Sequence, residues 1–128
     1  VPDPDMGIDP LAAQRDPIAP AHNFRAHNAP LGMVFLDAAA LPSGYQRTAL
    51  VALHGSWNRS TPVGARVMVT YLDDNGDAIK MEPFAEGWLN AAGRYLGRPV
   101  DVAQYIDGSI LVSDDKAGAV YRIYYSGK

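Results

Sequence analysis

After Pro30 the chain alternates between short apolar runs and turn-forming residues. The runs are too short for free-standing helices, are rich in Val, Ile, Leu and Tyr, and in several cases alternate with a period of two, which is typical of β-strands. They are LGMVFL (31–36), TALVAL (48–53), ARVMVTYL (65–72), AIKMEPF (78–84), VDVAQY (100–105), SILVS (109–113) and AVYRIYY (119–125). The pattern therefore predicts seven strands.

The connections between these runs predict antiparallel hairpins. Asn75-Gly76 is the dipeptide that best accepts a type I′ turn, and Asp107-Gly108 is expected to act in the same way. One segment, 86–95, favours a helix, but its glycines limit it to one or two turns. Loop lengths group the first four strands into one sheet and the last three into most of a second.

The predicted fold class is therefore all-β, with antiparallel four-stranded meanders. Such meanders are the blades of a β-propeller, and two of them are too few to close one. The chain is expected to be part of a larger body, with a small β-sandwich as the alternative. The first thirty residues hold six of the ten prolines, so residues 1–29 are predicted to form an extended arm and residues 30–128 the β-domain.

Composition excludes several function classes. The net charge is −3 without a basic cluster, which argues against nucleic-acid binding. The chain has no cysteine, so disulfides, thiolate metal sites and thiol nucleophiles are excluded. It has no apolar run long enough to span a membrane, and its start at Val1 suggests a processed chain or a fragment.

The densest group of polar side chains is LHGSWNRS, residues 53–60, which directly follows an apolar run. A plain loop is one interpretation, because turn residues often cluster in this way. A hydrolase site with Ser56 as nucleophile and His54 as base is disfavoured, since no third group is in view and Ser56 lies on no G-x-S-x-G turn.

Metal sites are also disfavoured. DDNGD (73–77) begins like a calcium loop but lacks the glycine and the glutamate that the loop needs later, so a hairpin turn is favoured. His22 and His27 have no acidic or cysteine partner at a useful spacing. Asp114 and Asp115 are interpreted as a pair of turn carboxylates, one of which is available for a cation or an arginine.

Three stretches together resemble one family. They are HNAPLGMVF (27–35), LVALHGSWNRSTPVGARV (50–67) and GRPVDVAQYIDGSILVSDDKAGAVYRI (97–123), and they are similar to the C-terminal part of the quinoprotein sugar dehydrogenases. Within that family the chain resembles the L-sorbosone dehydrogenase and aldose sugar dehydrogenase branch. The resemblance implies about two blades of a six-bladed propeller that uses pyrroloquinoline quinone (PQQ). Ala65 and Tyr105 depart from the usual pattern.

PQQ is a planar aromatic tricarboxylate, so its pocket needs cations, neutral donors and a flat apolar wall. The resemblance assigns cofactor binding to six residues. Arg59 and Arg98 would bind carboxylates, Asn58 would donate, and Trp57 would form a wall. His27 and His54 would lie at the mouth of the central channel. The family's catalytic base and calcium ligands lie upstream, so neither a catalytic residue nor a metal ligand is assigned here.

The predicted function is thus part of an oxidoreductase that oxidises an aldose or sorbosone-type sugar and is inactive as this chain alone. The alternative is a non-catalytic module, derived from a propeller, that binds carbohydrate or a protein partner. The expected partners are a sugar and the rest of its own polypeptide or an oligomer, with the electron acceptor unidentified. The resemblance also implies a bacterial protein of the periplasm or the secreted fraction.

Overall fold

A computed structural model describes residues 18–37, 39 and 41–127. It contains seven strands, as the sequence pattern predicts. They are β1 (Pro30–Phe35), β2 (Thr48–Leu53), β3 (Arg66–Leu72), β4 (Ala78–Ala85), β5 (Pro99–Gln104), β6 (Ile110–Asp114) and β7 (Ala119–Ile123). The part of the arm that is described, residues 18–29, has no strand or helix of its own, and residues 1–17 lie outside the description. The domain boundary at residue 29 stays a prediction.

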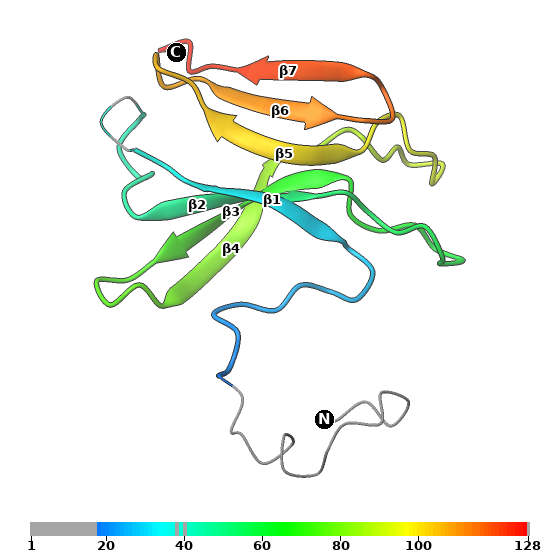
Figure 1. Cartoon of the computed structure of the whole chain (residues 1–128), viewed down its shortest axis with the longest axis horizontal. Helices are drawn as coiled ribbons and strands as arrows, with labels where there is room; N and C mark the ends of the chain where they lie inside the picture. The colour runs from blue at the N-terminus through cyan, green and yellow to red at the C-terminus, as the bar shows by residue number, and fades with distance from the viewer. Residues whose placement is uncertain (1–17, 38, 40, 128) are drawn as a thin grey trace.

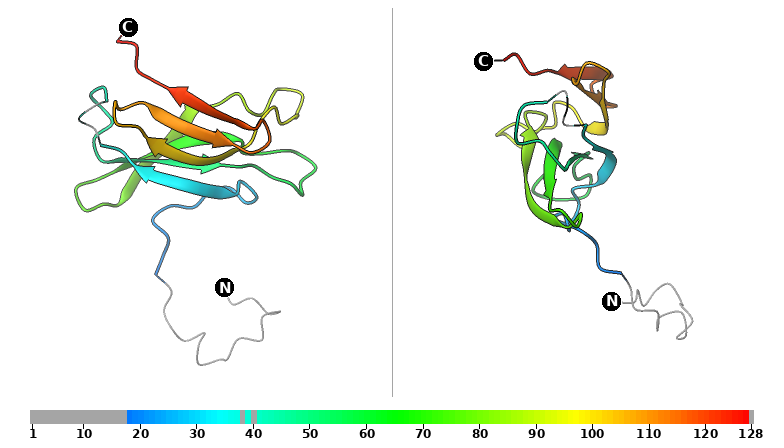
Figure 2. Two further views of the ribbon diagram at one scale, coloured as in Figure 1. Left: turned by 45° about the horizontal axis from the view of Figure 1, so that its top comes forward. Right: turned by 90° about the vertical axis from the view of Figure 1, so that its left-hand side faces the viewer.

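The strands form two antiparallel meanders (Figure 1). The first sheet has the order β1-β2-β3-β4 and the second the order β5-β6-β7. This is the predicted grouping, and the all-β fold class is confirmed. The two sheets pack on each other as neighbouring blades do, with β1 of the first blade beside β5 of the second (Figure 2).

The core lies between the two sheets. Apolar side chains from both blades and the connecting loop meet there, namely Leu36, Leu50, Ala52, Ala65, Val67, Val69, Trp88, Val102, Ile110 and Val112. The middle strand β2 is buried along its whole length, and Trp88 packs edge-on against Tyr121 with ring centroids 5.4 Å apart. Burial of this apolar surface is what holds one blade against the other.

The inner strands approach closely at one glycine. A Cβ placed on Gly32 of β1 would lie 2.6 Å from the Cα of Asp101 in β5, closer than real atoms come. The close approach therefore requires a residue without a side chain at this position.

Both predicted hairpins form, but their turns are not type I′. Asp73 and Asp77 close a three-residue loop in which Gly76 has φ 88°, while Asn75 is not among the residues with positive φ. Gly108, with φ 83°, ends the equivalent loop between β5 and β6. A type I′ turn needs positive φ at two successive residues, whereas a three-residue loop needs it only at the glycine.

The predicted helix at 86–95 is wrong. This segment is a turn-rich loop closed by an isolated bridge between Leu89 and Tyr95. Gly87 and Gly93 have φ of 126° and 73°, outside the helical range, and the Asn90 side chain accepts backbone hydrogens at 3.0 and 2.9 Å. The asparagine carbonyl thus organises the loop in place of helical hydrogen bonds. The described residues include no helix long and apolar enough to cross a membrane.

The meander topology brings several loops to one edge. Because neighbouring strands run in opposite directions, the segments before β1 and β5 and after β2 and β6 lie at the same end, on the right of Figure 1. The tips of the loops at 73–77 and 105–109 lie at the other end. All six residues predicted to bind the cofactor belong to segments at the first edge, which is called the loop edge below.

Candidate functional site

The loop edge begins where the segment 27–29 pairs with the end of β2. The amide of His54 donates to the carbonyl of Ala29, and that of Gly55 to the carbonyl of Asn28, both at 2.9 Å. This pairing places the His27 segment beside the His54 segment. His27 itself is exposed and has φ 67°.

His54 forms a contact between the blades. Its Nε2 lies 3.0 and 3.2 Å from the two carboxylate oxygens of Asp115, which follows β6. The imidazole is the more sheltered partner, with 20% of its side chain exposed against 60% for the carboxylate. The structure therefore joins a predicted site histidine to one of the two aspartates that the sequence analysis interpreted as turn carboxylates, one of them available for a cation or an arginine.

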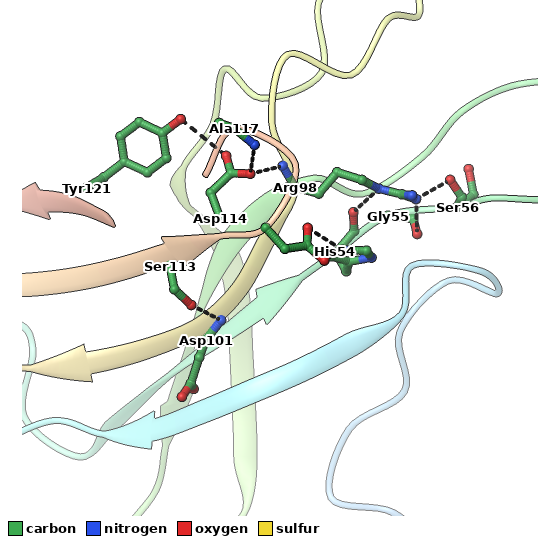
Figure 3. A network of polar contacts seen from close by, with 10 residues as sticks. His54, Gly55, Ser56, Arg98, Asp101, Ser113, Asp114, Ala117 and Tyr121 are labelled. Carbon is green, nitrogen blue, oxygen red and sulfur yellow. Dashed lines mark hydrogen bonds and ion pairs between the residues drawn. The ribbon is translucent and has the colours of Figure 1, made fainter. Parts of the chain in front are cut away.

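Arg98 also joins the second blade to this segment. Its Nε donates to the carbonyl of His54 at 3.2 Å, and its Nη2 donates to the carbonyls of Gly55 at 2.9 Å and Ser56 at 2.5 Å (Figure 3). The guanidinium also lies over the ring of Tyr95, 4.7 Å from its centroid. Two of the three guanidinium nitrogens that were predicted to bind a carboxylate thus bind backbone carbonyls. Nη1 has no hydrogen bond among the described residues.

Asp114, the last residue of β6, fixes the backbone from which Arg98 extends. Its side chain is buried, with 3% of the residue exposed. Oδ1 accepts from the amides of Arg98 at 2.9 Å and Ala117 at 2.8 Å, and Oδ2 accepts from the Tyr121 hydroxyl at 3.2 Å. Burial by itself would raise the pKa of Asp114, but these donors together outweigh it and hold the pKa below its ordinary value.

Ser56 has a structural role. It is 4% exposed, its Oγ lies 2.9 Å from the Tyr95 hydroxyl, and it accepts from the Val63 amide at 3.2 Å. The Tyr95 hydroxyl in turn donates to the Val63 carbonyl at 2.8 Å. These bonds close the base of the loop that follows β2.

Three more of the predicted residues lie on that loop. Trp57 is 85% exposed, Asn58 is exposed, and Arg59 is half-buried with its Nε donating to the Thr61 carbonyl at 3.2 Å. Of the six predicted residues, only His54 and Arg98 are joined to each other by a hydrogen bond among the described residues. The other four lie at the loop edge because the segments that carry them end there. Within the described ranges, no group of three or more metal-ligating side chains gathers.

Sequence reasoning missed Asp114, Asp115 and Tyr95 as parts of this network. The available signal was the pair of aspartates at the end of a predicted strand, because that position lies at the same edge as the end of β2. Their partners depend on how the two sheets dock, which the local pattern does not contain.

Comparison with known proteins now identifies the family. A family model described as TrAA12-like matches residues 9–126. The chain belongs to this family. A curated relative of the TrAA12-like chain, an uncharacterized protein from Borreliella burgdorferi, is 40% identical over 105 residues, which are 81% of this chain and 28% of the relative.

Two kinds of solved structure resemble the TrAA12-like chain. The iodide structure of the Trichoderma reesei carbohydrate-active enzyme of family AA12 has a TM-score of 0.62 at 22% identity, over 91% of this chain and 30% of that one. The holo form of the PQQ domain of pyranose dehydrogenase from Coprinopsis cinerea has a TM-score of 0.50 at 30% identity, over 75% and 26%. The chain thus spans less than a third of each protein it matches.

These neighbours support the resemblance to PQQ-dependent sugar oxidoreductases at the level of the family. The L-sorbosone and aldose sugar dehydrogenase branch is not among them, so that finer assignment stays a prediction.

Proposed function

We propose that this chain forms two neighbouring blades of a PQQ-dependent sugar oxidoreductase and that its loop edge forms part of the cofactor pocket. The observation that carries the proposal is the 30% identity to a PQQ domain solved in its holo form. Membership of the TrAA12-like family and the gathering of the predicted site residues at one edge support it.

The residues at the loop edge fit the chemistry of PQQ. Arg98 offers Nη1 to a carboxylate, as a single contact instead of the predicted fork. Arg59 donates through Nε to Thr61 and keeps its terminal nitrogens for a second carboxylate. Asn58 and the exposed indole of Trp57 supply a neutral donor and a flat stacking surface. His27 and His54 supply ring nitrogens.

PQQ, when bound, accepts two electrons from the substrate. The residues of this chain bind and orient the ligand, and none of them is assigned as a catalytic base. The base and the calcium ligands belong to the remainder of the protein in this proposal. The substrate is a sugar, with an aldose or a sorbosone-type sugar as the finer expectation, and the location is the periplasm or the secreted fraction.

The rival function is a β-module that has lost the redox site and binds carbohydrate or a protein partner. The use of two Arg98 nitrogens on backbone carbonyls is the observation that favours it, because fewer donors are left for a carboxylate cofactor. Cofactor binding separates the two functions.

The test is a titration with PQQ, followed by tryptophan fluorescence, with and without calcium. The chain holds two tryptophans, and they differ sharply in exposure, 85% for Trp57 and 9% for Trp88. A bound quinone beside the loop edge should quench Trp57 in a saturable way. Trp57→Phe should remove most of the quenching, whereas the matched variant Trp88→Phe should retain it. Sugar or protein binding without any saturable response to PQQ would favour the rival function.

A further inference from the structure

The contact with Asp115 distinguishes the two ring nitrogens of His54. Nε2 lies within hydrogen-bond distance of both oxygens of Asp115, at 3.0 and 3.2 Å. An ionised carboxylate only accepts hydrogen bonds, so the hydrogen in this contact belongs to Nε2. In the neutral form of the imidazole, the other nitrogen, Nδ1, then has no hydrogen.

Three segments of the chain hold His54, two through its backbone and one through its ring. The His54 amide donates to Ala29 at 2.9 Å, and its carbonyl accepts from Arg98 at 3.2 Å, so its backbone is fixed on both sides. Asp115 directly follows Asp114, whose buried carboxylate is bound to the second blade. The Asp115 carboxylate, which accepts the Nε2 hydrogen, is thus held in place by the hydrogen bonds of the neighbouring Asp114 at the end of β6.

The other ring nitrogen of His54, Nδ1, is at least partly accessible. It has no hydrogen-bond partner among residues 18–37, 39 and 41–127. Over the same residues, every buried side-chain nitrogen or oxygen has a partner. Nδ1 is therefore not fully buried, and in the neutral imidazole it is available to accept a hydrogen bond at the loop edge.

We propose that Asp115 is a positioning residue that holds His54 in the tautomer with a bare Nδ1, so that Nδ1 accepts a hydrogen bond from the ligand. The ligand part rests on the proposed function. The matching donors are the hydroxyl of a sugar or the pyrrole N–H of PQQ. Asp115 acts through His54 and does not itself touch the ligand.

The tautomer is tested without any cofactor, by long-range proton–nitrogen NMR of the histidine rings. The chain has three histidines, and His54→Gln identifies the His54 signals by their loss. The expected spectrum shows a protonated Nε2 and a bare Nδ1. In Asp115→Ala the Nε2 hydrogen should exchange with water about ten- to a hundredfold faster, as expected when a bond to a charged acceptor is lost.

Two variants make this test specific. Asp115→Glu should restore part of the protection, because it keeps a carboxylate. Asp74→Ala removes a carboxylate that pairs with Arg47 at the opposite edge and should leave His54 unchanged. A hydrogen on Nδ1 in the wild type, or an unchanged exchange rate in Asp115→Ala, would overturn the positioning role.

The ligand half is tested by adding PQQ and then D-glucose while following Nδ1. We expect one of the two to shift the Nδ1 resonance, and Asp115→Ala to bind that probe roughly two- to tenfold more weakly. A shift with PQQ identifies the cofactor as the donor, and a shift only with glucose identifies the sugar. Saturable quenching of Trp57 by PQQ with no shift from either probe would overturn this inference and leave the proposed function standing.

Discussion

At the scale of single residues, Arg98 shows what a sequence motif conveys and what it omits. The motif GRPVDV predicted an arginine at the site, and the structure places it at the loop edge. The motif did not show that Nε and Nη2 bind the carbonyls of His54, Gly55 and Ser56. Those carbonyls belong to the other blade, so their position depends on how the sheets dock.

Because these hydrogen bonds join the two blades, we expect Arg98 to stabilise the fold as well as to bind the cofactor. Arg98→Ala should lower the free energy of unfolding by about 2–3 kcal/mol, because three carbonyls lose a charged donor. Arg98→Lys should recover less than half of that, since an ammonium lacks the planar fork. Arg94→Ala, an exposed arginine of the same loop, is the control and should stay within about 0.5 kcal/mol of the wild type. Urea unfolding measures the free energy of unfolding of all three variants. A decrease for Arg98→Ala no larger than for Arg94→Ala would show that Arg98 does not stabilise the fold.

At the scale of elements, the strands were largely readable from the sequence and the connections were not. β2 was predicted with its observed bounds, because TALVAL is a continuous apolar run between turn residues. The loop at 86–95 was mistaken for a helix, because the left-handed φ of Gly87 and Gly93 and the Asn90 side chain have no counterpart in a periodicity pattern. Asp114 looked like a turn residue, since its donors come from three other places in the chain.

The end of β6 should make the fold sensitive to acid. The folded-state pKa of Asp114 lies below its ordinary value of 3.8, so the unfolded chain takes up the proton first as the pH falls. The stabilisation is therefore complete above that ordinary value and is lost as the pH falls through the folded-state pKa. Asp114→Asn keeps an oxygen for the amides of Arg98 and Ala117 but cannot titrate. We expect it to be less stable than the wild type at pH 7, by about 1 kcal/mol.

The measurement is urea unfolding of the wild type and Asp114→Asn from pH 7 down to about pH 3. The gap between the two proteins should narrow below about pH 4, where the wild type loses its advantage. Asp74→Asn, an exposed carboxylate at the other edge, serves as the control. A constant gap over the whole range would show that the Asp114 charge does not stabilise the fold.

At the scale of the whole molecule, one face of the inner strand β1 lies outside the core. The core fills the space between the sheets, while the opposite face of β1 presents Met33 and Phe35, which are 58% and 64% exposed. Val34, between them, packs toward the core, so strand alternation directs its two neighbours outward. Exposed apolar side chains gathered on one sheet face usually mark an interface.

We propose that a neighbouring blade or a second copy covers this face, and sedimentation velocity tests the proposal on the 128-residue chain. The chain should associate increasingly with concentration, and the double variant Met33→Ser, Phe35→Ser should associate less. Ile106→Ser is the matched control, because Ile106 is 91% exposed at the tip of a hairpin loop and should not affect association. In a longer polypeptide that supplies the neighbouring blade, the double variant should instead destabilise the fold by at least about 2 kcal/mol, since both side chains are then buried. A chain that stays monomeric, together with a longer protein that tolerates the double variant, would show that this face has no partner.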